Sequence, residues 1–293
     1  MKIKKLLVEK LWDRYTFSID FNEQVTILIG KNGSGKSTIL NLIDKSLSNN
    51  NITYQLKKIE LLSLENKIIS NKKEFEYLFL STFDMEIKNQ KIVKKNYNSK
   101  SYIKTELDVI LNNLVTNFKF YLLKIKEEIE KVQNNFDKEL EIYANKEDIK
   151  GFKEKILEKN REVNKINRHI NLFKDKINKF FQDTEKEITL DENNSLIFKL
   201  KDKSYLTPYQ LSSGEKQILI IMLNIMLLEN KETILLMDEP EISLHVEWQK
   251  VFLETLLELN PNLQIIIATH SPAIVSKRFR SKVVTLSNFH LKD

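Results

Sequence analysis

Three short segments of this chain carry side chains whose types and spacing could hold and cleave a phosphate chain. The first runs Gly30, Lys31, Asn32, Gly33, Ser34, Gly35, Lys36, Ser37 and Thr38. Its spacing is G-x-x-x-x-G-K-[ST], in which glycines let backbone amides approach phosphate oxygens and the Lys36 ammonium adds positive charge. A hydroxyl such as that of Ser37 suits Mg²⁺. The segment predicts a loop that binds the β- and γ-phosphates of ATP together with Mg²⁺.

The second segment is an apolar run that ends in two adjacent carboxylates, Asp238 and Glu239. This is the Walker B pattern, in which Asp238 would hold Mg²⁺ and Glu239 would polarise the attacking water as general base. The third is another apolar run, 265–268, followed closely by His270. A histidine at the end of a strand can donate a hydrogen bond to a phosphate.

A further segment, Leu211-Ser212-Ser213-Gly214-Glu215, precedes an apolar stretch from Lys216 to Leu228. Small residues at the amino terminus of a helix leave backbone N–H groups open to an anion. We therefore expect a second phosphate-contacting turn at Ser212, Ser213, Gly214 and Glu215.

The elements that must position these residues can be read from the flanking sequence. The β-branched run 25–29 predicts a buried strand before the phosphate loop, and 38–43 continues as an apolar-periodic helix. Strands are also expected at 75–80, 234–237, 265–268 and 282–286. The five glycines and four prolines are scarce, and most lie in or beside these motifs, where backbone must approach a ligand.

Residues 105–183 differ in composition, with no proline and one glycine. Apolar side chains recur there at spacings of three and four, which predicts two long helices folded as an antiparallel hairpin. The first arm, 121–148, has 5 basic and 8 acidic residues, and the second, 150–182, has 10 basic and 4 acidic residues. The arms should attract each other, although a helical subdomain packed on the rest of the chain stays an alternative.

Taken together, these motifs resemble the ABC-type ATPases. The segment 211–215 resembles their LSGGQ signature, and 265–272 resembles their switch-histidine strand; the motifs also follow the family order. The sequence Asp-Glu-Pro-Glu-Ile-Ser-Leu-His at 238–245, with Ala-Thr-His-Ser-Pro at 268–272, looks like the soluble SMC, RecF and OLD branch. That branch includes small ATPases of phage-defence operons, such as those of Septu, retron and PARIS systems.

The resemblance implies an α/β fold: an ABC-type P-loop NTPase head, with a mixed sheet flanked by helices and the helical hairpin inserted. The halves of the head would be 1–104, with the phosphate loop, and 184–293, with the signature, Walker B and His270. It also implies a head-to-tail homodimer with two ATP molecules between the subunits. The signature of each subunit would contact the γ-phosphate held by the other, His270 would touch the γ-phosphate, and 243–245 would cross the interface.

The sequence departs from the family pattern at several positions. Ser213 replaces the second signature glycine, and Glu215 replaces the glutamine. The glutamine of the Q-loop has no clear counterpart: 81–84 occupy its place, and Gln90 is a weak match. Adenine stacking by Trp12 or Tyr15 is an alternative to the expectation that both are packed inside the protein.

Composition bounds the remaining choices. With 293 residues, of which 41% are hydrophobic, the chain can bury a sizeable core. The absence of cysteine excludes disulfides, thiolate metal sites and a zinc hook, and it fits a reducing cytoplasm. Charged residues interrupt the amino-terminal region, so no export signal is expected, and no apolar run approaches the roughly 20 residues of a membrane span. No membrane partner is expected.

We expect a slow ATPase that acts as the sensor or regulatory subunit of an anti-phage defence system. Because 23 residues follow His270, no appended nuclease domain is expected. A separately encoded effector, a nuclease or toxin, would supply the output. One alternative is an SMC- or RecF-like DNA repair ATPase. The other is a transporter ATPase subunit, and the helical insertion argues against this second alternative. A homodimer or higher homo-oligomer is expected, and the net charge of +6 leaves nucleic-acid contact open.

Overall fold

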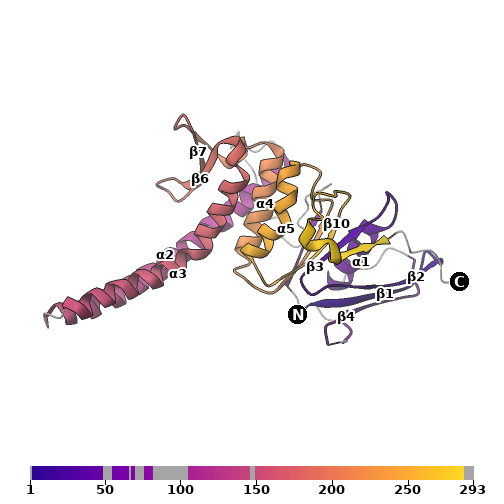
Figure 1. The fold of residues 1–293 in the computed structure, drawn as a ribbon, viewed down its shortest axis with the longest axis horizontal. Helices are drawn as coiled ribbons and strands as arrows, with labels where there is room; N and C mark the ends of the chain where they lie inside the picture. Colours follow the sequence, from indigo (N-terminus) through magenta and orange to yellow (C-terminus); the bar gives the residue numbers. More distant parts are fainter. Residues whose placement is uncertain are drawn as a thin grey trace, which may run out of the picture. The chain divides into compact units, whose positions relative to one another are not determined.

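The computed structural model describes residues 2–48, 55–65, 67–69, 76–81, 105–145 and 149–286. The chain divides into two compact units. Figure 1 shows the ribbon coloured along the sequence. The first unit joins Met1–Ser101 to Leu228–Asp293, and the second is Tyr102–Leu227. The second unit is longer than the expected insertion, because it also contains the signature segment. The division at 104 and 183 stays a prediction.

A parallel sheet of five strands forms the centre of the first unit. Its strand order is β11-β3-β10-β9-β5, and all four pairings are parallel. The strands are β3 (Val25–Ile29), β5 (Glu76–Ser81), β9 (Thr233–Asp238), β10 (Leu263–Ala268) and β11 (Val283–Thr285). β10 is buried along its whole length, as expected for a strand covered on both faces.

Two helices follow strands of this sheet. Helix α1 (Lys36–Ser48) begins in the phosphate loop after β3, and helix α5 (Val246–Leu259) links β9 to β10. A short 3-10 helix, η4 (Lys277–Lys282), precedes β11. The strands predicted before the phosphate loop, at Walker B and before His270 are therefore confirmed, with ends that differ by one or two residues.

A second, antiparallel sheet in the first unit was not predicted. Its order is β2-β1-β4, made by β1 (Ile3–Leu11), β2 (Tyr15–Asp20) and β4 (Lys58–Ser63). Leu6 of β1, Leu40 of α1 and Leu236 of β9 belong to one buried cluster. This shared core fixes α1, and with it the phosphate loop, against both sheets.

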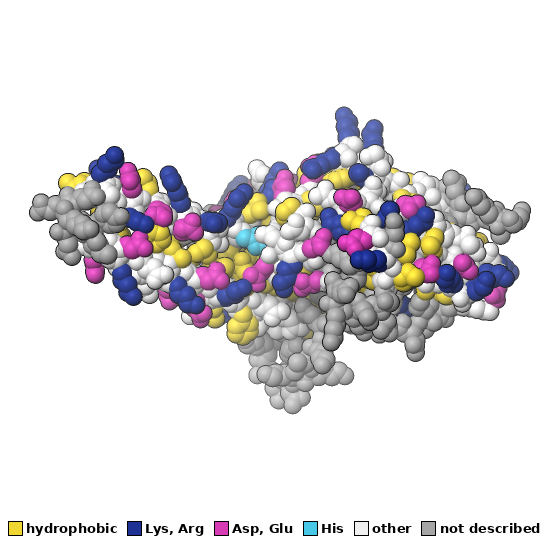
Figure 2. Space-filling model, turned by 90° about the horizontal axis from the view of Figure 1, so that it is seen from below, with side chains coloured by type: hydrophobic (Ala, Val, Ile, Leu, Met, Phe, Trp, Pro, Cys, Tyr) yellow, Lys and Arg dark blue, Asp and Glu magenta, His cyan; other side chains and the backbone are white. Residues whose placement is uncertain are grey.

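The second unit is built on a helical hairpin, as predicted. Helices α2 (Glu106–Asn145) and α3 (Ile149–Phe180) run antiparallel and side by side (Figure 1). Lys155 and Lys159 of α3 form ion pairs with Glu139 and Asp137 of α2 at 2.8 and 2.5 Å. The expected attraction between an acidic and a basic arm is thus confirmed. Figure 2 shows both signs of charge interspersed over this surface.

The hairpin has a buried end and an exposed end. The buried apolar residues all lie near the ends that join the rest of the unit: Leu111, Leu114, Phe118, Tyr121, Leu122, Ile125, Ile170, Phe173, Ile177 and Phe180. Between 126 and 169, no residue whose burial is described is buried. Part of the hairpin is therefore core and part is an exposed arm.

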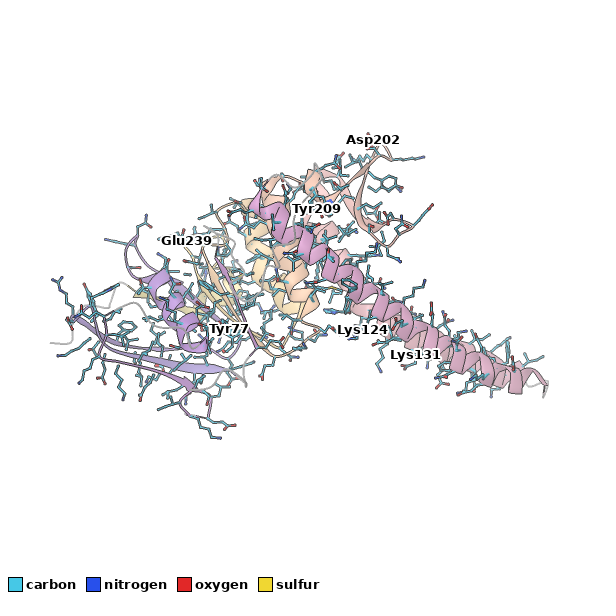
Figure 3. The ribbon with its side chains drawn as sticks, turned by 180° about the vertical axis from the view of Figure 1, so that it is seen from behind. Tyr77, Lys124, Lys131, Asp202, Tyr209 and Glu239 are labelled. Carbon is cyan, nitrogen blue, oxygen red and sulfur yellow. The ribbon has the colours of Figure 1, made fainter. Side chains whose placement is uncertain are left out.

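The remaining elements of the second unit pack at the buried end of the hairpin. They are a small antiparallel sheet and the helix that follows the signature turn. The sheet contains β6 (Lys186–Leu190), β7 (Leu196–Leu200) and β8 (Tyr205–Leu206), and the helix is α4 (Ser213–Leu227). Short 3-10 segments are η2 (Gln182–Thr184) and η3 (Pro208–Gln210). Figure 3 marks Tyr209, whose hydroxyl bonds Asn112 of α2 at 2.9 Å.

None of the helices in the part of the chain that the structure describes is long and apolar enough to cross a membrane.

Candidate functional site

The phosphate loop connects β3 to α1 in a conformation that requires its glycines. Gly33 and Gly35 have φ angles of +77° and +90°, where a side chain would be strained. A Cβ at Gly30 would lie only 2.4 Å from Ser34 Oγ. The Ser34 oxygen is itself buried, and no described residue forms a hydrogen bond with it. The loop is therefore shaped for a close approach of backbone to a ligand.

Lys36, at the start of α1, points into the protein. Only 5% of its surface is exposed, and its Nζ lies 3.1 Å from the carbonyl of Gly30 and 2.6 Å from His270 Nε2. Burial lowers the pKa of Lys36, against the opposing effect of Glu239 and Asp238. A phosphate oxygen bound here would be an anionic partner for this ammonium, whose described hydrogen-bond contacts are carbonyl oxygens and an imidazole nitrogen.

The two Walker B carboxylates differ in environment. Asp238 ends β9, and burial raises its pKa, although a hydrogen bond with Ser37 opposes that rise. The two residues expected to hold Mg²⁺ are thus in contact. Hydroxyl and carboxylate oxygens are suitable ligands for that ion.

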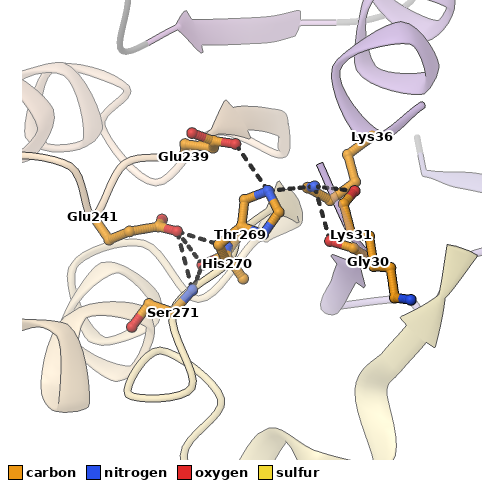
Figure 4. Close-up of polar contacts among 8 residues, drawn as sticks. All are labelled: Gly30, Lys31, Lys36, Glu239, Glu241, Thr269, His270 and Ser271. Carbon is orange, nitrogen blue, oxygen red and sulfur yellow. Dashed lines mark hydrogen bonds and ion pairs between the residues drawn. The ribbon is translucent and has the colours of Figure 1, made fainter. Parts of the chain in front are cut away.

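Glu239 follows with a φ of +47°, an unusual conformation for a residue with a side chain. Its backbone N–H donates to Ala268 O at 2.8 Å, which ties the end of β9 to the end of β10. Its side chain turns toward His270, with Oε1 3.2 Å from Nε2 (Figure 4). Lys36, Glu239 and His270, which are far apart in sequence, therefore meet at one point.

Two cavities meet over the phosphate loop. One, of about 620 Å³, is lined by the loop together with Lys36, Glu239 and His270. The other, of about 500 Å³, is mostly apolar and is lined by the same loop with Leu11, Trp12, Tyr15, Phe17, Ile39 and Leu286. Because the cavities share the loop residues, a polar compartment adjoins an apolar aromatic one. A nucleoside triphosphate has the same division between phosphates and base.

The expectation that Trp12 is packed inside the protein is wrong. Its side chain is 44% exposed and lines both cavities. The Trp12 ring contacts that of Tyr15 edge to face, with centroids 6.1 Å apart. Trp12 lies in a tight turn between β1 and β2 with a φ of 52°, and this turn presents the indole to the cavity.

The signature turn lies in the second unit. Ser212 and Ser213 are exposed, and Gly214 is partly exposed. Ser212 and Glu215 form a capping box: the Ser212 N–H donates to Glu215 Oε2 at 2.9 Å, and the Glu215 N–H donates to Ser212 Oγ at 3.3 Å. These two bonds fix the backbone of the turn, and Ser212 and Ser213 stay exposed at the amino terminus of α4.

Glu215 itself is not displayed to a ligand, contrary to expectation. It is 2% exposed, and its Oε1 accepts hydrogen bonds from Lys186 at 2.6 Å and Thr184 at 2.8 Å. Burial alone would raise the pKa of Glu215, but the bonds from Lys186, Ser212 and Thr184 together lower it. The S-x-x-E spacing of a capping box was the sequence signal for this inward position.

Sequence reasoning missed two residues that organise the site. Glu241 accepts hydrogen bonds from three successive residues around His270 (Figure 4). Gln249 on α5 accepts a hydrogen bond from Ser271 in the same segment. For the Q-loop, Ser81 ends β5 and pairs in register with Asp238. Residues 82–84 and Gln90 lie outside the described residues.

The basic group near the carboxyl end is partly engaged within the protein. Arg278 pairs with Glu254 at 3.1 Å, and Lys282 donates to Asn22 Oδ1 at 3.2 Å. Of the basic arm, Lys155 and Lys159 pair with α2. Part of the charge that suggested nucleic acid thus has internal partners.

Comparison with known proteins assigns the chain to a family. Residues 25–276 match the family described as "AAA domain, putative AbiEii toxin, Type IV TA system". The "Retron Vc95 probable ATPase" of Vibrio cholerae serotype O1 biovar El Tor is 32% identical over 88 residues, which cover 26% of this chain and 17% of that protein. The chain thus matches only a small part of that relative.

Among solved structures, the SmcHead bound to the C-winged helix domain of ScpA has the same fold. It superposes with a TM-score of 0.51 over 97% of this chain and 94% of that chain, at 13% identity. This likeness concerns the fold alone. The match over most of the chain shows that it belongs to the family "AAA domain, putative AbiEii toxin, Type IV TA system", with the ABC-type P-loop NTPase fold.

Proposed function

We propose that this protein binds ATP with Mg²⁺ and hydrolyses it slowly, within a head-to-tail dimer that regulates a separately encoded defence effector. The observation that carries the ATPase part is the convergence of Lys36, Glu239 and His270 in one polar cavity that adjoins an apolar aromatic cavity. The triphosphate would occupy the first cavity and the base the second, beside Trp12.

Each polar group has a distinct task in this proposal. The loop amides and Lys36 bind the β- and γ-phosphates, and Ser37 with Asp238 would hold Mg²⁺, which neutralises charge on the phosphates. Glu239 orients water and accepts its proton. Since Lys36 and His270 are 2.6 Å apart, a γ-phosphate between them requires that contact to open. His270 would then donate to a γ-phosphate oxygen.

The dimer is proposed from the signature turn. Ser212 and Ser213 are exposed at the amino terminus of α4, and the buried Glu215 fixes their backbone. A turn of this kind is suited to a phosphate brought by another molecule. We therefore expect the turn of one subunit to complete the nucleotide site of its partner.

The defence role is proposed from the family and the relative. The family description refers to a toxin–antitoxin system, and the curated relative is a retron ATPase. A regulatory ATPase that holds or releases an effector agrees with both. The second reading, an SMC- or RecF-like repair ATPase, would be supported by ATP-dependent duplex binding in the absence of a partner protein.

The ATPase proposal can be tested with two variants that differ in the step affected. Lys36→Ala should abolish ATP binding in calorimetry, because it removes the cation from the phosphate cavity. Glu239→Gln should bind ATP normally but release little phosphate, because the general base is lost. Unchanged hydrolysis in a folded Glu239→Gln protein would refute the assignment of the base.

The defence role requires a test in the native host. Deletion of the gene together with its neighbours should raise the plaquing efficiency of a restricted phage, and restoration of the whole locus should lower it again. A locus carrying Lys36→Ala should fail to restore protection or should release the effector constitutively. Full protection by the Lys36→Ala locus would show that ATP binding has no part in defence.

A further inference from the structure

A single carboxylate oxygen holds the segment that carries His270. Glu241 Oε1 accepts a hydrogen bond from the Thr269 hydroxyl at 2.6 Å and from the His270 backbone N–H at 2.7 Å (Figure 4). The Ser271 backbone N–H donates to the same oxygen at 3.1 Å. Hydrogen bonds to an ionised acceptor are stronger than neutral ones, so the contact fixes the backbone at His270.

The other oxygen of Glu241 makes loss of these hydrogen bonds more costly. Oε2 is buried and has no hydrogen-bond partner among the described residues. A buried carboxylate is costly unless it is hydrogen-bonded. The bonds that Oε1 receives from 269–271 therefore offset the cost of burying Oε2, and movement of the segment away from Glu241 would be unfavourable.

A second contact joins the same segments. Gln249 of α5 is 8% exposed, its Oε1 accepts a hydrogen bond from the Ser271 hydroxyl, and its Nε2 donates to Leu244 O at 2.8 Å. Together with the bond from Glu239 N–H to Ala268 O, this fastens 239–245 to 268–271 at three places. His270 and Glu239 thus belong to one rigid arrangement.

We propose that Glu241 is a positioning residue for His270: its carboxylate oxygen fixes the backbone from which the imidazole reaches Glu239 and Lys36. This inference rests on the proposed ATPase function. The hydrogen bonds described for the Glu241 carboxylate all come from 269–271, and toward Lys36 of the phosphate loop it has only a Coulombic effect, smaller than those of Glu239 and Asp238. It acts through geometry, and it sets the rate of hydrolysis without touching the nucleotide.

The first test separates geometry from charge. Glu241→Ala removes the acceptor, and kcat should fall on the order of 100-fold, the loss typical when a reacting group is displaced by about 1 Å. The affinity for ATP should change little, because the phosphate loop is intact. Glu241→Gln removes the charge but keeps one carbonyl acceptor, so it should retain most of the activity. Equal loss in both variants would overturn a geometric role.

The second test asks whether Glu241 acts through His270. In a His270→Ala background, Glu241→Ala should cause little further loss of kcat, because the side chain that it positions is absent. The matched control is Gln264→Ala on β10, a fully buried residue whose amide bonds Ile3 and Asn22. Any effect of the control should be the same in both backgrounds. An undiminished effect of Glu241→Ala without His270 would overturn the inference.

The third test needs no hydrolysis. With ¹³C-labelled histidine, His270→Ala assigns the ring signal of His270, and Glu241→Ala should shift that signal while leaving His169 of the second unit unchanged. An unmoved His270 signal in the folded variant would overturn the inference. A wild-type protein with no ATPase activity, in which Glu241→Ala still moves the signal, would refute the proposed function and support the positioning role.

Discussion

At the scale of the residue, the phosphate site places charge where the fold disfavours it. Burial lowers the pKa of Lys36 and raises the pKa of Asp238, so each group is held in surroundings that oppose its ionised form. Glu239 adds a φ of +47°. Such features persist when function requires them, at a cost in stability.

Asp238→Asn should therefore stabilise the nucleotide-free protein. A carboxyl whose folded pKa is above its ordinary value of 3.8 is ionised at pH 7 at a cost to the folded state, and this cost disappears as the pH falls below that value. Removing the charge should raise the free energy of unfolding by on the order of 1 kcal/mol in urea denaturation. Mg²⁺-dependent ATPase activity should be lost.

The control for this prediction is an aspartate whose pKa is shifted in the opposite direction. Asp202, labelled in Figure 3, is exposed, and hydrogen bonds from Ser204 lower its pKa. Asp202→Asn should leave the stability unchanged or reduce it slightly. If both substitutions have the same effect, burial of Asp238 is not the cause.

Glu215 illustrates the opposite case. Its folded pKa is below its ordinary value of 4.5, so its contribution to stability is complete above about pH 4.5 and is lost as the pH falls through the lowered pKa. Glu215→Gln should cost about 2 kcal/mol at pH 7, the usual worth of hydrogen bonds to a buried charge. Urea midpoints between pH 3 and pH 7 should fall with acidity in the wild type and change less in the variant.

At the scale of the element, buried ion pairs tie the hairpin to the signature helix. Asp108 in the first turn of α2 pairs with Lys216 of α4 at 2.7 Å, and Lys186 of β6, just after α3, pairs with Glu215 at 2.6 Å. The two adjacent residues of α4 thus contact both ends of the hairpin insertion. Breaking either pair would leave a buried charge without its counter-ion and destabilise the second unit.

This arrangement predicts where the hairpin can be shortened. Replacing 126–169 with a short glycine-serine linker removes no side chain described as buried, so the protein should stay soluble and bind ATP. Replacing all of 105–183 would remove the Phe118–Phe173 contact and the Asp108–Lys216 pair, and the product should aggregate. Calorimetry with ATP and size-exclusion chromatography compare the two. Loss of binding in the shorter deletion would indicate that the distal arm has a structural role.

Sequence was sufficient where local chemistry dictates structure. The glycine spacing of the phosphate loop is compatible with few backbone conformations. The strand before the loop and the helix after it follow from the apolar pattern. The hairpin follows from its long apolar periodicity. These elements are the ones that the structure reproduces.

Sequence failed where pairing is irregular or long-range. The sheet β2-β1-β4 was missed because register shifts between Ile3 and Lys5, and between Val8 and Leu11, interrupt the alternation typical of a strand. Glu241 was missed because its partners lie about 28 residues further along the chain. No local pattern distinguishes it from a solvated acid.

At the scale of the whole molecule, the motifs are divided between the two compact units. The phosphate loop, Asp238, Glu239 and His270 belong to the first, and the signature turn belongs to the second. The ATP-sandwich dimer that we propose would bring the first unit of one subunit and the second unit of its partner to the same nucleotide. That arrangement predicts contacts between different chains that depend on ATP.

Cysteine crosslinking can detect these contacts without background, because the chain contains no cysteine. Ser34 Oγ is buried, so the reporter in the phosphate loop is better placed at the exposed Asn32. One chain would carry Asn32→Cys and a second, larger tagged chain Ser213→Cys, both with Glu239→Gln to prevent turnover. Only contact between different chains can then link the two cysteines.

With ATP and a short bismaleimide, the mixed pair should yield a crosslinked heterodimer, because the γ-phosphate joins the loop of one chain to the signature of the other. ADP should yield little, since it lacks that phosphate. Adding Ser212→Arg to the Ser213→Cys chain places bulk and charge at the contact, so crosslinking should be lost although ATP still binds the intact loop. Equal crosslinking with and without ATP would mean that the subunits meet by other surfaces and that the nucleotide does not close the dimer.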